Sequence, residues 1–121
     1  MRTLGAGLLV PIGVCVLAGA VAAHAFLERA APRVGSTVRT PPTEVRLWFT
    51  ERLEPAFSTV RVTNAADQPV DLGDPRVDPA APQELRVSVQ PLAPGRYTVH
   101  WRVLSVDTHV TEGTFAFTVA P

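Results

Sequence analysis

The chain has 121 residues, and its 11 basic and 11 acidic side chains give a formal net charge of zero at pH 7. This length suits one domain. The basic residues are all arginine and are not clustered, so nothing indicates binding to nucleic acid or to an anionic surface. The only cysteine, Cys15, lies near the N-terminus, so the domain must be stable through apolar burial and sheet pairing without a disulfide.

Residues 1–23 have the pattern of a secretory signal peptide. A positive start precedes an apolar stretch over residues 4–20, and small side chains follow up to Ala23. This pattern predicts cleavage between Ala23 and His24, and a mature domain of residues 24–121 in the periplasm or elsewhere in the cell envelope. An uncleaved membrane anchor is the alternative, but the apolar run is short for a span and is interrupted by glycines and a proline.

The mature sequence has the pattern of an all-β domain. Proline and glycine recur at short intervals, and no stretch shows a sustained apolar period of 3.6 residues. Apolar and polar residues alternate instead over residues 45–50, 60–63, 85–89, 97–103 and 115–119. Period two places each apolar set on one face of a strand, so these strands can enclose a core between two sheets, as in a domain of immunoglobulin size.

The segments between these strands are typical of turns and loops. Residues 64–67 are predicted to form a hairpin connection, and residues 71–82, rich in Asp, Pro and Gly, to form a loop. Strand parity predicts that Trp101 belongs to the core and that Trp48 and His100 face the other way. We therefore assign His100 no role in a site.

His24 becomes the first residue of the mature chain if cleavage falls after Ala23. An N-terminal histidine offers the α-amine and the ring Nδ1, which together close a chelate on a metal ion. The amine has a pKa low enough for a strong Lewis acid to deprotonate it near neutral pH. Taken alone, the simpler interpretation is that His24 is only the residue that follows a cleavage site.

Asp107, Thr108 and His109 form a second candidate feature. In an extended segment, residues i and i+2 point the same way, so Asp107 and His109 would present a carboxylate and an imidazole on one side. Nitrogen and oxygen donors in a tetragonal arrangement suit Cu(II). Taken alone, a polar loop in which Asp107 caps a turn is the simpler interpretation of the motif. Glu51, at the end of a predicted strand, offers either a further oxygen near a metal or a solvated carboxylate.

These features occur together, in this order, in one known family. Residues 24–27, 31–36, 45–51, 95–109 and 112–117 resemble the corresponding segments of CopC-type periplasmic copper-resistance proteins. Each short motif is weak by itself, but their order and spacing are specific, and the resemblance spans essentially the whole mature chain.

The resemblance implies a small Greek-key β-sandwich or barrel of about seven strands that binds Cu(II). It implies that His24 gives its amine and ring nitrogen, His109 an opposing imidazole, and Asp107 a carboxylate ligand. Glu51 matches an acid near the same site in some members. This arrangement is called a histidine brace, and it also resembles the copper site of lytic polysaccharide monooxygenases.

Two departures from the family pattern are informative. Some members carry a methionine-rich loop that binds Cu(I), but the only methionine here is Met1. Because thioethers suit Cu(I), we expect one site for Cu(II) and no Cu(I) site. The second departure is Val110 and Thr111, where members often have proline and an apolar residue.

We therefore expect a non-enzymatic Cu(II) carrier or buffer that either sequesters copper or delivers it to a separate, CopD-like inner-membrane transporter. One alternative is a copper-dependent oxidase or monooxygenase that uses the same brace, which turnover of a reductant with oxygen or peroxide would reveal. The other is a metal-free interaction domain, which metal analysis of the purified protein would reveal.

Overall fold

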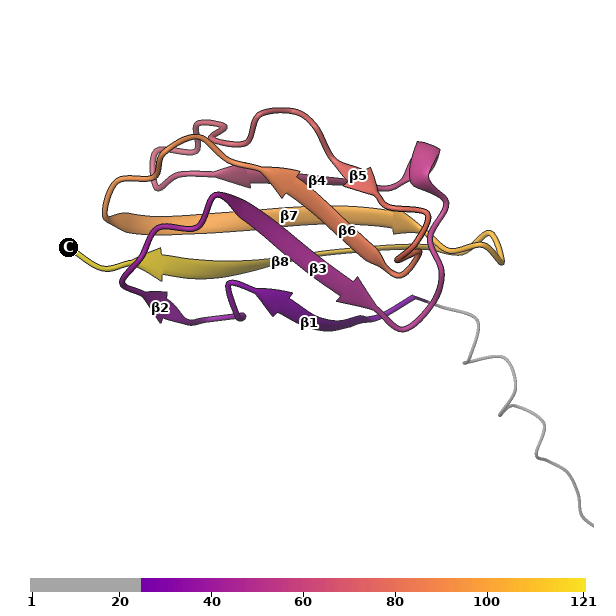
Figure 1. Cartoon of the computed structure of the whole chain (residues 1–121). Helices are drawn as coiled ribbons and strands as arrows, with labels where there is room; N and C mark the ends of the chain where they lie inside the picture. Colours follow the sequence, from indigo (N-terminus) through magenta and orange to yellow (C-terminus); the bar gives the residue numbers. More distant parts are fainter. Residues whose placement is uncertain (1–24) are drawn as a thin grey trace, which may run out of the picture.

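The structure, a computed structural model, describes residues 25–121 (Figure 1). The predicted signal peptide, its cleavage point and His24 lie outside the described residues. The elements are β1 (Leu27–Ala31), β2 (Thr37–Val38), β3 (Glu44–Phe49), the 3-10 helix η2 (Pro55–Phe57), β4 (Thr59–Thr63), β5 (Arg76–Val77), β6 (Glu84–Ser88), β7 (Gly95–Leu104) and β8 (Val110–Val119). Between Ala25 and Pro121, the chain forms no helix long and apolar enough to cross a membrane.

The strands form two four-stranded sheets, with the orders β1-β3-β6-β5 and β2-β8-β7-β4. The pair β2–β8 is parallel, and the other paired strands are antiparallel. The predicted all-β sandwich is confirmed. The prediction of a loop over residues 71–82 was wrong in one detail, because this segment contains β5. A strand of two residues is too short to show an alternating pattern.

The core lies between the two sheets and follows the period-two pattern of the sequence. The largest fully buried apolar side chains come from β3, β4, β6, β7 and β8: Val45, Leu47, Phe49, Val60, Val62, Leu85, Val87, Val99, Val103, Phe117 and Val119. Removing this surface from water is the main stabilising contribution in a domain whose described part has no cysteine.

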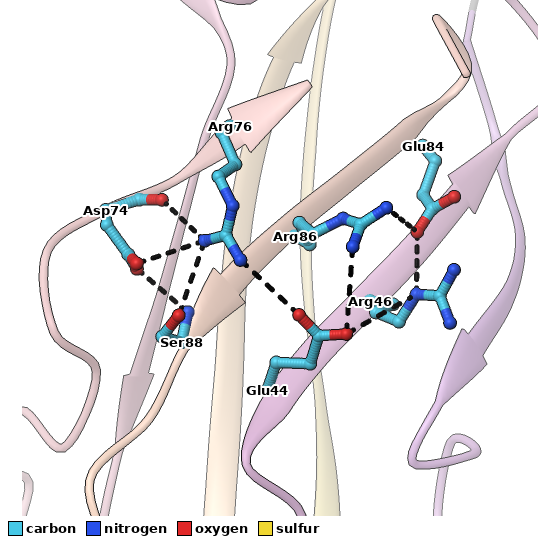
Figure 2. A network of polar contacts seen from close by, with 7 residues as sticks. All are labelled: Glu44, Arg46, Asp74, Arg76, Glu84, Arg86 and Ser88. Atoms are coloured by element: carbon cyan, nitrogen blue, oxygen red, sulfur yellow. Dashed lines mark hydrogen bonds and ion pairs between the residues drawn. The ribbon is translucent and has the colours of Figure 1, made fainter. Parts of the chain in front are cut away.

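The solvent face of the sheet that contains β3 and β6 carries a network of ion pairs (Figure 2). Glu84 is 5% exposed and accepts from Arg46 at 2.6 Å, while Arg86 lies 3.3 Å from the same carboxylate oxygen. The hydrogen bond with Glu84 raises the pKa of Arg46. Arg29 and Arg46 also lie near the ring of Trp48, at 3.8 and 4.9 Å from its centroid. This stacking explains why a tryptophan on the polar parity of β3 is half-buried.

One end of the sandwich gathers three segments that are distant in the sequence. The described chain begins there, the β3–β4 connection passes there, and β7 turns into β8 there (Figure 1). Leu53 forms a bridge with Ser105, Glu54 N donates to Leu104 O at 2.8 Å, and Val106 N donates to Arg52 O at 3.0 Å. These bonds join the connection after β3 to the end of β7, and so they join the two sheets.

Trp101, predicted to belong to the core, is half-buried and packs against it. Its ring meets Phe49 edge to face, with 5.1 Å between centroids. Its partner on β8 is Gly113, where an added Cβ would lie 2.7 Å from Trp101 Cζ2. Glycine is therefore required at position 113 by the indole that lies over it.

We predict that Gly113→Ala lowers the free energy of unfolding by about 1–3 kcal/mol, because the new methyl group must displace an indole already packed on Phe49. Thermal or urea unfolding followed by circular dichroism measures the change. The exposed neighbour Thr114 provides a control, since Thr114→Val should alter stability by no more than about 0.5 kcal/mol. Equal stability of Gly113→Ala and the wild type would contradict this account of the glycine.

Candidate metal centre

The β7–β8 loop brings Asp107 and His109 together. Asp107 Oδ1 lies 3.3 Å from His109 Nδ1. The predicted proximity is confirmed, but the predicted extended segment was wrong. The loop is a tight turn, closed by bonds from Ser105 N to His109 O at 3.0 Å and from Thr108 N to Ser105 O at 2.8 Å. Thr108 has a φ of 74°, a left-handed conformation that is unusual for a β-branched residue and is maintained by the closure around it.

Ser105 orients the carboxylate of this pair. Its side chain is fully buried, and its hydroxyl donates to Asp107 Oδ1. The same oxygen accepts a bond from His109 N at 3.3 Å. The Ser105 hydroxyl, followed by the side chain and backbone N–H of His109, lowers the pKa of Asp107. This role of Ser105 could not be predicted from the sequence, because only the fold shows that its side chain is buried beneath the loop.

The pair is accessible to a dissolved ion. The side chain of His109 is 48% exposed, and that of Asp107 is 34% exposed. An imidazole and an ionised carboxylate at this separation can give a nitrogen and an oxygen donor to one divalent ion. A carboxylate bonded to a ring nitrogen also fixes the orientation of the imidazole.

The start of the described chain is attached beside this loop. Ala25 is fully buried, and its carbonyl accepts a bond from Thr111 Oγ1 at 2.7 Å. Phe26 N donates to Thr50 Oγ1 at 2.9 Å, and Thr50 N donates to Phe26 O at 2.9 Å. The residue that follows His24 therefore lies between the end of β3 and the start of β8.

Glu51 and His100 have different surroundings. Glu51 is half-buried at the start of the β3–β4 connection, directly after Thr50, whose N–H donates to Phe26 O. Among residues 25–121, however, no three His, Cys, Asp or Glu side chains are grouped closely enough to hold a metal ion. Glu51 thus stays a predicted ligand. His100 lies on the face of β7 that points away from the core, where its Nε2 is 3.0 Å from Thr63 Oγ1. The prediction that it faces away from the core is confirmed.

These features define a class of protein. It is a small β-sandwich with an imidazole–carboxylate pair in the loop between its two longest strands. The model of the CopC domain matches residues 27–120, and the chain therefore belongs to the CopC domain family.

Copper resistance protein C of Xanthomonas campestris pv. juglandis is 35% identical over 103 residues, which cover 80% of each chain. The crystal structure of CopC from Methylosinus trichosporium OB3b is similar with a TM-score of 0.76 and 36% identity, over 81% of this chain and 95% of that one. PcoC, a methionine-rich copper resistance protein from Escherichia coli, matches with a TM-score of 0.69 and 34% identity, over 80% of this chain and 99% of that one.

We predict that Asp107 titrates below the ordinary aspartate pKa of about 3.9 in the metal-free protein, and that Ser105→Ala raises this pKa by removing its principal cause. Because the folded-state pKa is depressed, ionised Asp107 stabilises the fold above about pH 4. That contribution is lost as the pH falls through the folded-state pKa.

Carboxyl-carbon NMR during a pH titration measures this pKa. Asp74 is an internal control, because its pKa is lowered chiefly by the backbone N–H of Ser88 and should not respond to a change at Ser105. An Asp107 pKa that is the same in Ser105→Ala and in the wild type would show that the hydroxyl does not have this effect.

Proposed function

We propose that the mature protein binds one Cu(II) ion at the end of the sandwich that carries the β7–β8 loop, and that it carries or buffers copper in the periplasm or cell envelope. The contact between Asp107 and His109 is the observation that carries this proposal. Membership of the CopC domain family supports it, because relatives in that family are named as copper resistance proteins.

His24 would supply two donors, its α-amine and its ring Nδ1. This requires cleavage after Ala23, since only a terminal residue has a free amine. The attachment of Ala25 to Thr111 supports the assignment, because consecutive Cα atoms are about 3.8 Å apart and Thr111 is two residues beyond His109. A folded chain that begins at His24 would therefore begin beside the second histidine.

His109 would supply an imidazole nitrogen and Asp107 a carboxylate oxygen. With three nitrogen donors and an oxygen donor, the set favours Cu(II) over softer ions. The Asp107 side chain is ionised at neutral pH, as aspartates ordinarily are, so its carboxylate can offset part of the ion's charge. Glu51, at the same end, is proposed as a further oxygen ligand or as a hydrogen-bond partner of a ligand.

The site is proposed to be single and selective for the oxidised ion. Met1 and Cys15, the only methionine and the only cysteine, both precede the proposed cleavage point. The mature chain would therefore lack the soft sulfur donors that suit Cu(I). PcoC differs in this respect, since it is described as methionine rich.

Copper is the cargo of this proposed carrier. An exposed pair at a loop suits uptake and release better than a buried cage would, because a second protein can approach the ion directly. A separate, CopD-like membrane transporter is proposed as the recipient. A copper-dependent oxidase would instead be indicated by sustained turnover of a reductant with oxygen by the copper-loaded protein.

We predict that one extra residue retained before His24 weakens Cu(II) binding by more than about 100-fold, because the amine becomes an amide and the chelate is lost. Competition with a chelator of known affinity measures the change. The matched control adds the same residue after Pro121, at the other end of the sandwich (Figure 1). Equal affinity of all three forms would rule out a terminal chelate.

We predict that His109→Ala changes the EPR spectrum of the Cu(II)-loaded protein, because it removes a nitrogen donor. His100→Ala is the control, since His100 bonds Thr63 on the far face of β7 and should leave the spectrum unaltered. A His109→Ala spectrum identical to that of the wild type would remove His109 from the site.

A further inference from the structure

Two threonines hold the first described residues in place. Thr111 is half-buried on β8, and its hydroxyl donates to the carbonyl of fully buried Ala25 at 2.7 Å. These two residues are 86 positions apart. A buried carbonyl that loses its hydrogen-bond donor is costly, so this bond selects one position for the start of the domain.

Thr50 holds the next residue through both its side chain and its backbone. Its hydroxyl accepts from Phe26 N at 2.9 Å, and its own N–H donates to Phe26 O at 2.9 Å. Phe26 is therefore fixed to the end of β3, while Ala25 is fixed to the start of β8. Because β3 and β8 belong to different sheets, the two threonines locate the N-terminal segment relative to both sheets.

The attachment of Ala25 and Phe26 to the two threonines also bears on metal binding. Chain termini are usually poorly ordered unless something ties them down. Metal–ligand bonds keep within about 0.2 Å of their normal lengths, so both donors of a terminal residue must reach the ion together with the donors of the loop. The two threonines adjoin the other proposed donors, since Thr111 follows His109 by two residues and Thr50 directly precedes Glu51.

We infer that Thr111 and Thr50 are positioning residues for copper, which hold Ala25 and Phe26 so that the terminal histidine lies opposite His109. The inference rests on the proposed function and adds residues that contribute no donor atom to the ion. It also gives Thr111, which departs from the family pattern, a specific role. The Thr111 side chain contributes more to this positioning than the Thr50 side chain. The reason is that the backbone bond from Thr50 N to Phe26 O survives any change of the Thr50 side chain.

The test replaces each hydroxyl by a methyl group in the mature protein that begins at His24. Thr111→Val should weaken Cu(II) binding by about 10- to 100-fold and change the EPR spectrum, by analogy with the loss of a residue that orients a metal ligand. Thr50→Val should cause a smaller loss. Thr111→Ser should restore both affinity and spectrum, because it restores the hydroxyl. Thr114→Val, an exposed substitution on the same strand, should change neither.

A double-mutant cycle separates positioning from general damage to the fold. If Thr111 acts through the terminal amine, Thr111→Val should cause no further loss of affinity in a form that carries an extra residue before His24. Circular dichroism and thermal unfolding of the metal-free variants establish whether each is folded. If Thr111→Val does not fold, Thr50→Val tests the same inference.

Different outcomes would contradict the positioning role of the threonines and the proposed copper site itself. Wild-type affinity and spectrum in both valine variants would overturn the positioning role while leaving the copper site intact. An additive loss in the extended form would likewise overturn it, because the hydroxyl would then act independently of the amine. Failure of the wild-type mature protein to take up Cu(II) would overturn both.

Discussion

The junction between Ser105 and the β3–β4 connection is the constraint on which the site depends. Ser105 pairs with Leu53, closes the β7–β8 loop onto His109, and directs its hydroxyl to Asp107. One buried residue therefore links the two sheets and sets the orientation of the carboxylate. The exposed pair at the loop is thus oriented by a buried residue, which is how metal ligands are generally held by the residues behind them.

The rest of the sandwich provides a stable frame for this end. Its core is made of valine, leucine and aromatic side chains, mostly on alternating positions, and the arginines and glutamates of Figure 2 cover one outer face. Glu84 shows how closely this face is packed, because its carboxylate is nearly buried between two guanidinium groups. Removing one of these arginines would lower the stability of the fold by more than the net contribution of the ion pair, because the buried carboxylate would lose a partner.

The sequence was sufficient to predict β3, β4, β6, β7 and β8, because alternation of apolar and polar residues directly reflects burial of one face. It was not sufficient for β1, whose residues do not alternate between apolar and polar, or for β2 and β5, whose two residues each cannot show a period. The spacing of Asp107 and His109 correctly predicted that they lie close together. The structure brings them together through a turn at left-handed Thr108, however, and not through an extended segment. A resemblance between short motifs in the right order supplied the family, which the comparisons confirmed.

The supporting residues of the site could not be predicted in the same way. Ser105 and Thr111 act through hydroxyl groups, and a hydroxyl in a strand-rich sequence carries no signal of its partner. Thr111 bonds a carbonyl 86 residues away, so its role exists only in the folded protein. His24 lies outside the described residues, and its role as a ligand stays a prediction that depends on where the exported chain begins.

The intact mass of the exported protein, measured under native conditions after expression of the full chain, shows both where the mature chain begins and how many copper ions it holds. The account predicts a polypeptide that starts at His24 and carries a single copper ion, which is released when the protein is denatured. A polypeptide that starts at another residue, or one that starts at His24 and takes up no copper, would contradict it.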